Sequence, residues 1–244
     1  MNYDWSWRFL FGPSLTGEGS YVVMLMHGFG WTILISLTAW LIALAFGIAL
    51  GVARTLPRGV LRRFATLYVH LFRNTPLLVQ LFLWYFVLPE WLPKAWGDTL
   101  KSMNLVLNQV LTVLLCLSLY TAAKVAEHVR AGIASLPAGQ YRAAQALGFG
   151  VIASYRHVVL PQAFRIALPP LTSELMNVFK NSAVAMTIGL MELTGTSRQV
   201  SEFSGHPFEA FAFATLGYML IALVAARVMR VIEARSRISG ATQT

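Results

Sequence analysis

Four polar residues interrupt an otherwise apolar stretch in the C-terminal half of the chain, residues 166–191. Successive members lie three, six and seven positions from the first, so they share one face of a helix. Charged groups in such a stretch are costly to bury and normally face a cavity or a partner. Either they form ion pairs that hold helices together, or they form a polar stripe along a solute path, with the lysine attracting a carboxylate. The four residues are Glu174, Asn177, Lys180 and Asn181. Pro169 and Pro170 precede them and are predicted to kink or interrupt the helix.

A second group of residues forms a short helix in the connection between two apolar segments. Pro137 and Gly139 break the chain before residues 140–147, and Gly148 stands where a helix stop is expected. Pro161 is predicted to end this helical region and start a new one before the next apolar segment. The helix combines small residues with larger apolar side chains, which suits docking into a groove of a partner. A helix lying on lipid headgroups is the alternative, and both stay open. The surface residues are Ala143, Ala144, Leu147, Gly148 and Phe149.

The sequence lacks the residue patterns that several kinds of catalysis and cofactor binding require. The chain contains no Gly-Lys pair and therefore no phosphate-binding loop for ATP. It contains no GxSxG motif, its histidines are scattered, and its one cysteine, Cys116, lies inside an apolar run. We expect no catalytic residue, no metal site and no cofactor in this chain, and a membrane enzyme is disfavoured.

The composition places these elements in a membrane. Of the 244 residues, 57% are hydrophobic and only 12% are charged, half the charged fraction of a typical soluble domain. A bilayer core of about 30 Å requires roughly 20 apolar residues in a helix, because the backbone must satisfy its own hydrogen bonds. We therefore predict an all-α integral membrane protein, with five transmembrane helices. The predicted spans are residues 28–52, 66–88, 102–124, 166–191 and 208–228.

The excess of basic residues predicts the orientation. The formal net charge is +9, and fourteen of the nineteen basic residues fall in the loops on one side of the predicted spans. Because basic residues collect in cytoplasmic loops, we predict an external, periplasmic N-terminus and a cytoplasmic C-terminus, and no binding to nucleic acid. The first span then serves as the targeting signal. The fourteen are Arg54, Arg58, Arg62, Arg63, Arg73, Lys124, Arg130, Arg142, Arg156, Arg165, Arg227, Arg230, Arg235 and Arg237.

Small residues recur every four positions along the first span and end in a GxxxG motif. Such a stripe lets two helices approach closely. Packing within the monomer and contact with another subunit are both compatible with it. The residues are Ala39, Ala43, Gly47 and Gly51.

The loop of residues 135–161 resembles the EAA loop of bacterial ABC-importer permeases. Ala143 and Ala144, then Gly148 after three residues, then Val158 and Leu160-Pro161, follow the spacing of that motif, with Val158 where isoleucine is usual. Arg142 stands where the family commonly has glutamate. The resemblance covers the whole chain and extends to polar amino-acid permeases, most of all to the subunits of glutamate/aspartate importers. Further residues carry it: Phe72 to Gln80, Ala126-Glu127, Arg130, Gly132-Ile133, Asn177 and Lys180 to Ser182.

This resemblance implies a type I importer fold, with residues 1–244 as one permease domain in a bacterial inner membrane. It implies a second, homologous permease or a second copy of this chain, an ATPase pair that holds ATP and Mg²⁺, and a periplasmic binding protein that delivers an amino acid. A stand-alone channel or secondary transporter is the alternative, which would need internal repeats or more spans. The implied coupling residues are Arg142, Ala143, Ala144, Leu147, Gly148, Phe149 and Pro161.

Overall fold

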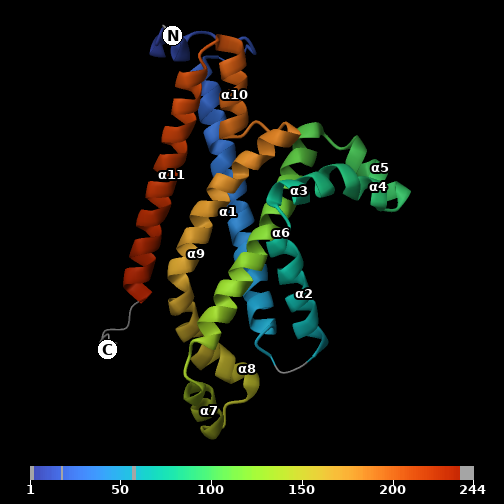
Figure 1. The fold of residues 1–244 in the computed structure, drawn as a ribbon, viewed down its shortest axis with the longest axis vertical. Helices are drawn as coiled ribbons and strands as arrows, with labels where there is room; N and C mark the ends of the chain where they lie inside the picture. The colour runs from blue at the N-terminus through green and yellow to red at the C-terminus, as the bar shows by residue number, and fades with distance from the viewer. Residues whose placement is uncertain (1–2, 18, 57–58, 237–244) are drawn as a thin grey trace. The chain divides into compact units, whose positions relative to one another are not determined.

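The computed structural model describes residues 3–17, 19–56 and 59–236 as helices joined by short connections (Figure 1). Arg58 and Arg237, counted above among the basic residues, lie outside the described ranges. Outside the helices, an isolated bridge pairs Pro13 with Ser20. The long helices are α1 (Tyr21–Ala53), α2 (Val60–Asn74), α6 (Leu105–Ala134), α9 (Leu160–Ser182) and α11 (Pro207–Ser236). The shorter ones are η1 (Trp7–Phe11), α3 (Leu77–Phe82), η2 (Leu83–Val87), α4 (Leu88–Trp91), α5 (Lys94–Ser102), α7 (Ala138–Ala146), α8 (Val151–Ser154), η3 (Tyr155–Val159), η4 (Ala183–Ile188) and α10 (Leu193–Ser204).

The chain divides into two compact units. The first contains residues 1–41, 75–118 and 177–223, and the second contains residues 42–74, 119–176 and 224–244. By sequence, the second unit carries all fourteen basic residues assigned above to one side, with three acidic residues. The first carries the other five basic residues and seven acidic ones.

Three helices among the described residues are long and apolar enough to cross a membrane, namely α1, α6 and α11. They cover the predicted spans 28–52, 102–124 and 208–228. The expectation of one continuous helix over residues 66–88 is wrong. The chain is bent between α2 and the helical segment Leu77–Trp91. The two helical segments are long and apolar enough to span a membrane only if they are taken together, as one broken span. Pro76 explains the break, because proline lacks an amide proton and disfavours helical geometry in the residue before it.

The predicted fourth span, residues 166–191, also differs. Helix α9 begins earlier, at Leu160, and ends at Ser182, after which a 3-10 helix leads to Gly189 with a φ of +88°. The expected interruption at Pro169 and Pro170 is absent, since both prolines lie inside the continuous helix. Among the described helices, α9 is not one of those that are long and apolar enough to span a membrane.

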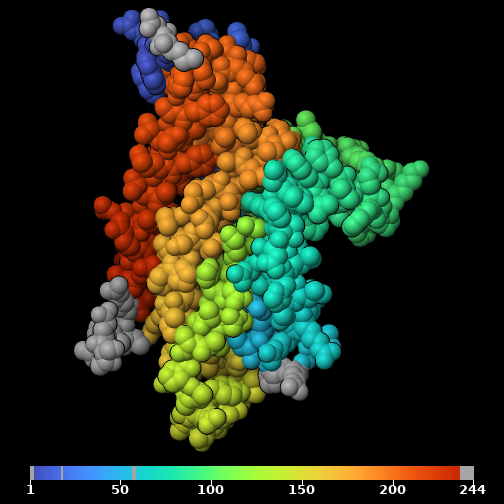
Figure 2. All heavy atoms as spheres, in the orientation of Figure 1, coloured from blue at the N-terminus to red at the C-terminus, as the bar shows by residue number. Residues whose placement is uncertain are grey.

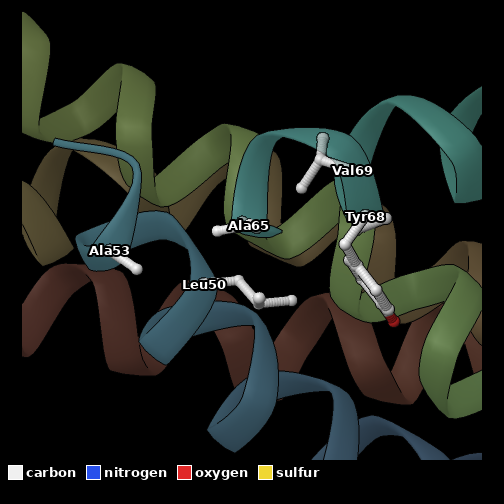
Figure 3. Packing of buried hydrophobic residues seen from close by; sticks show 7 residues of the cluster. Leu50, Ala53, Ala65, Tyr68 and Val69 are labelled. Atoms are coloured by element: carbon white, nitrogen blue, oxygen red, sulfur yellow. The ribbon is translucent and has the colours of Figure 1, made fainter. Parts of the chain in front are cut away.

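The second unit has a core at the contact of α1, α2 and α6 (Figure 3). It is formed by Leu50, Ala53, Ala65, Tyr68, Val69, Ala123 and Ala126. The Tyr68 hydroxyl donates a hydrogen bond of 2.7 Å to the carbonyl oxygen of Leu119. Two glycines of the small-residue stripe lie against α6 of the same chain, since a Cβ on Gly47 would be 2.6 Å from the Cβ of Val125 and one on Gly51 would be 2.8 Å from the Cβ of Val129. This part of the stripe therefore packs within the monomer.

The first unit has its own core near the chain's beginning. It brings together the N-terminal segment, α1, α10 and α11 through Leu10, Tyr21, Met24, Leu25, Val200 and Ala210. Glycine is required at one crossing, because a Cβ on Gly28 would lie 2.5 Å from Oγ1 of Thr196. Helices α1 and α10 thus contact each other closely.

Candidate functional site

Helix α7 ends in a specific stop. Gly148 adopts a φ of +86°, a left-handed conformation that favours glycine. Its amide donates to the carbonyl oxygen of Gln145 at 2.9 Å, and the amide of Phe149 donates to that of Ala144 at 3.0 Å. These two bonds form a Schellman motif, which satisfies carbonyls at the end of the helix. The helix stop predicted at Gly148 is confirmed.

Most of the predicted surface of α7 is accessible. Leu147 is 79% exposed, and Arg142, Ala143 and Gly148 are exposed beside it. Leu147 is therefore an exposed apolar side chain at the end of a short helix, and no described residue of its own unit covers it. The segment lies beyond the ends of α6 and α9 in Figure 1 and projects from the surface in Figure 2.

One member of that surface faces the other way. Ala144 is only 3% exposed, so it packs against its own chain, and the prediction that it presents a small face to a partner is wrong. Ala144 lies on the side of α7 that packs against its own chain, whereas Arg142 and Ala143 lie on the exposed side. Phe149 keeps 39% exposure, and Pro161 is exposed as well.

Side chains hold α7 to the helices that follow it. The rings of Tyr141 and Tyr155 meet edge to face with centroids 5.9 Å apart. Tyr155, in the π-helical turn η3, also lies within 3.2 Å of the Thr55 hydroxyl at the end of α1. Amide Nε2 of Gln162 on α9 donates to Oε1 of Gln140 at 3.5 Å. Helix α7 is therefore in contact with η3 and α9, and through Tyr155 with Thr55, which follows α1.

The connection from α8 to α9 is helical throughout, so Pro161 does not end one helical region and start another as predicted. The turn before it widens instead into the π-helix Tyr155–Val159. Proline cannot donate to the carbonyl four residues earlier, and such local widening accommodates a disturbed hydrogen-bond ladder. The chain therefore passes from α8 into α9 as one helical stretch that includes Pro161.

A ring of arginines surrounds Glu127 on α6. Arg54 at the end of α1 and Arg130 on α6 both donate hydrogen bonds to its carboxylate, the latter through Nε at 3.0 Å. Nη1 of Arg73 on α2 lies 3.4 Å from Oε2. The side chain of Glu127 keeps 22% exposure. One carboxylate therefore ties α6 to α2 and to the residue that follows α1 in the second unit.

Glu174, the first residue of the polar stripe, is paired within its own unit. Its carboxylate lies 3.6 Å from Nζ of Lys124 and 3.5 Å from Nε2 of His128, both on α6. This geometry agrees with the interpretation of an ion pair that holds helices together. It joins α6 and α9 one turn away from the Glu127 ring.

The other three members of the stripe belong to the first unit. Lys180 is exposed near the end of α9, and Asn177 and Asn181 are half-buried beside it. Within the described ranges Lys180 forms no ion pair. An exposed cation flanked by two amides can bind a carboxylate, with the ammonium supplying charge and the amides supplying direction.

Two buried carboxylates were not singled out by the sequence. Glu192 is fully buried and accepts hydrogen bonds from the Tyr218 hydroxyl at 2.7 Å, from Thr32 at 3.3 Å, and from the amides of Thr194 and Gly195 at the start of α10. The available signal was an isolated acidic residue beside an apolar run, followed by a helix start. Glu192 therefore joins α1, α10 and α11.

Glu209 is the second, and it fastens the N-terminal segment. The Tyr3 hydroxyl donates to its carboxylate, and the amide of Ser6 donates at 2.8 Å. Burial, reinforced by the bond to Glu209, raises the pKa of Tyr3 to about 12. Nδ1 of His206 lies 3.5 Å away. Among the described residues, no group of three potential metal ligands is assembled.

Long apolar helices, a short exposed helix anchored to them, and internally paired charges define a membrane component of a larger transport assembly. The chain belongs to the family of binding-protein-dependent transport system inner membrane components, which matches residues 43–238. It is a transport subunit, a multi-pass membrane protein, and ATP hydrolysis in this class belongs to a separate subunit.

Individual relatives within this family are amino-acid permeases. The chain is 43% identical over 241 residues to the glutamate/aspartate import permease protein GltJ of Escherichia coli K12, covering 98% of both chains. It is 34% identical to the probable glutamine ABC transporter permease GlnM of Bacillus subtilis, over 82% of this chain and 87% of that one. A crystal structure of an amino acid ABC transporter with histidines matches 88% of this chain and 95% of that chain, with a TM-score of 0.74 and 27% identity. An inward-facing MetNI methionine transporter shares the fold, with a TM-score of 0.72.

Proposed function

We propose that this chain is one of two permease subunits in an ATP-driven importer of acidic amino acids in a bacterial inner membrane. The proposal has five spans, a periplasmic N-terminus and a cytoplasmic C-terminus. An ATPase pair docks on the cytoplasmic side, and a periplasmic binding protein delivers the solute. The observation that carries it is the exposed, anchored helix α7, at the spacing of the EAA loop, in a chain of this family.

The division of charge supports the proposed orientation. The unit that contains α7 carries fourteen basic residues and three acidic ones, whereas the other unit has more acidic than basic residues. Cytoplasmic segments of membrane proteins carry such an excess. A labelling experiment tests this: in a Cys116→Ser background, Trp7→Cys should react with an impermeant maleimide in spheroplasts. Gln140→Cys should react only after permeabilisation, and the opposite pattern contradicts the orientation.

Helix α7 is the proposed coupling helix. Leu147 would insert into an ATPase groove, with Arg142 and Ala143 alongside it, and the contacts to Tyr155 and Gln162 would pass the movement on to α9. ATP binding would close the ATPases, and the spans would then tilt to open outward. Hydrolysis would restore the inward-facing state.

Glutamate and aspartate are the proposed substrates, because the relative at 43% identity is a glutamate/aspartate permease. Lys180 would attract a substrate carboxylate and Asn177 and Asn181 would orient it. Intramembrane ionisable groups commonly mark solute pathways in transporters. A stand-alone channel or secondary transporter remains the alternative, and it predicts uptake without ATP or partners.

The test is uptake of radiolabelled glutamate by the complex in proteoliposomes. We expect Lys180→Ala to reduce ATP-driven uptake at least about tenfold, since a charge-assisted bond is worth about 1.5–3 kcal/mol, while Lys180→Arg retains part of it. Lys101→Ala, which breaks the exposed pair with Glu90, is the matched control. Normal uptake by Lys180→Ala removes Lys180 from the path.

A further inference from the structure

A small hollow opens in the second unit where η3 passes into α9. It has a volume of about 300 Å³ and is lined by residues of α1, α6, η3 and α9, and by Ser236 at the end of α11. The functional proposal uses none of its charged groups. Two arginines border it, Arg156 in η3 and Arg165 on α9, and both are exposed.

The charge of these arginines is not neutralised within the unit. Its three acidic residues are engaged elsewhere: Glu127 with the arginine ring, Glu174 with Lys124 and His128, and Glu233 with the Thr172 hydroxyl at 2.7 Å. In the described part of the chain, the side chains of Arg156 and Arg165 form neither ion pairs nor hydrogen bonds. Two free guanidinium groups beside one hollow attract an anion, and guanidinium matches phosphate geometry well.

The floor of the hollow is apolar, which restricts the kind of anion. It consists of Ile48, Val129, Ala163 and Ala167. Phe164 lines the hollow with 41% exposure, and Leu160, one helical turn before it on the same face of α9, lines it as well. A free inorganic ion gains nothing from these groups, whereas a molecule with a charged head and an apolar tail contacts both parts.

We propose that this hollow binds an anionic phospholipid, with the headgroup phosphate between Arg156 and Arg165 and an acyl chain along Leu160 and Phe164. The inference rests on the proposed orientation, which places this end of α9 at the cytoplasmic leaflet. Anionic lipids concentrate in that leaflet, and basic pockets between membrane helices bind their headgroups. The alternative occupants, free phosphate and an acidic surface of the ATPase, are separated by the experiment below.

The position gives the lipid a route to the transport cycle. Arg156 lies in the same π-helical turn as Tyr155, whose ring contacts Tyr141 of α7. A bound headgroup therefore touches the segment that connects α7 with α9. Replacing anionic lipid with neutral lipid should lower ATPase stimulation by the binding protein in the wild-type complex.

The test compares Arg156→Gln/Arg165→Gln with Arg227→Gln/Arg230→Gln, a control pair of exposed arginines on α11 that does not line this hollow. The purified permease–ATPase complex is delipidated, titrated with phosphatidylglycerol, and its lipid adducts are counted by native mass spectrometry. We expect about 25-fold weaker binding for the first pair, from the usual contribution of two basic residues at an anionic surface, and less than about twofold for the control.

Each other outcome overturns the proposal. Unchanged binding by the first variant removes the site, and an equal loss in the control pair shows a general effect of surface charge. Displacement of the lipid by equimolar inorganic phosphate identifies a free-anion site, and loss of the ATPase from the first variant assigns these arginines to the subunit interface. Counting lipid adducts does not require transport. The lipid result can therefore be interpreted even if the complex imports no amino acid.

Discussion

Phe149 and Ala144 are joined across the end of α7 by a hydrogen bond of 3.0 Å, from the backbone amide of Phe149 to the carbonyl oxygen of Ala144. The bond requires the left-handed conformation of Gly148 between them. It fixes the direction in which the chain leaves α7, and so it sets where the exposed Leu147 points in relation to α8. The direction of Leu147, which the proposed coupling to an ATPase uses, therefore depends on one glycine.

Replacing that glycine tests the relationship. We expect Gly148→Ala to strain the helix stop by about 1–2 kcal/mol, the cost of a left-handed conformation for an L-residue, and to reduce ATPase stimulation by the binding protein. Gly139→Ala is the matched control, because a Cβ there meets no atom within 4 Å and its φ is not positive. Equal ATPase stimulation in the two variants would show that the stop does not matter for coupling.

The contact of α1 with α6 provides a second prediction. A Cβ on Gly47 would lie 2.6 Å from the Cβ of Val125 and 2.8 Å from the carbonyl oxygen of Ala122. We expect Gly47→Ala to lower the free energy of unfolding by about 1–3 kcal/mol through overpacking. Gly30→Ala on the same helix meets nothing within 4 Å and should be neutral or stabilising by up to about 1 kcal/mol. Thermal melting of the purified complex measures both, and a lower melting temperature for Gly30→Ala contradicts this account.

A third prediction concerns the arginine ring. Glu127→Gln leaves Arg54, Arg73 and Arg130 close together without a counter-charge. We expect it to cost about 2 kcal/mol, below the 3–5 kcal/mol of a fully buried pair, because Glu127 keeps 22% exposure. Glu202→Gln removes only the exposed pair with Arg198 and should cost less than about 1 kcal/mol. Equal melting temperatures for the two variants would show that the ring contributes no stability.

The fourth prediction concerns Glu192. Glu192→Ala leaves the Tyr218 hydroxyl, the Thr32 hydroxyl and two helix amides without their acceptor. At about 1–3 kcal/mol for each unsatisfied buried group, we expect a loss of at least about 3 kcal/mol. Tyr218→Phe removes one donor and should cost about 1 kcal/mol. If both variants melt alike, Glu192 does not act as the common acceptor of this site.

Local patterns predicted much of this molecule. The apolar runs predicted α1, α6 and α11 because a membrane span must satisfy its backbone within one helix. Gly148 was predicted as a stop because few other residues accept a positive φ. The arginine ring does not follow from any local pattern. Which arginines join it depends on tertiary contacts, since Arg54 and Glu127 are far apart in the sequence.

The errors share a cause. Hydropathy averaged over a window of residues does not change much at a single proline. The apolar residues 66–88 were therefore predicted as one span, although the helix breaks at Pro76. At Pro161 the opposite error occurred, and at Pro169 and Pro170 the helix is not interrupted, because surrounding packing keeps a helix continuous where propensity favours a break. Ala144 faces inward because the adjoining helix covers it, and no local pattern of small residues reveals which side is covered.

The measurement that tests the central claim most directly is transport by the reconstituted assembly. The chain is combined in proteoliposomes with the proposed ATPase, second permease and binding protein, and uptake of labelled glutamate and aspartate is followed with ATP inside. We predict uptake that requires both ATP and the loaded binding protein and that fails when Leu147→Glu prevents the ATPase from docking. Uptake without ATP, or full uptake by Leu147→Glu, would contradict the account.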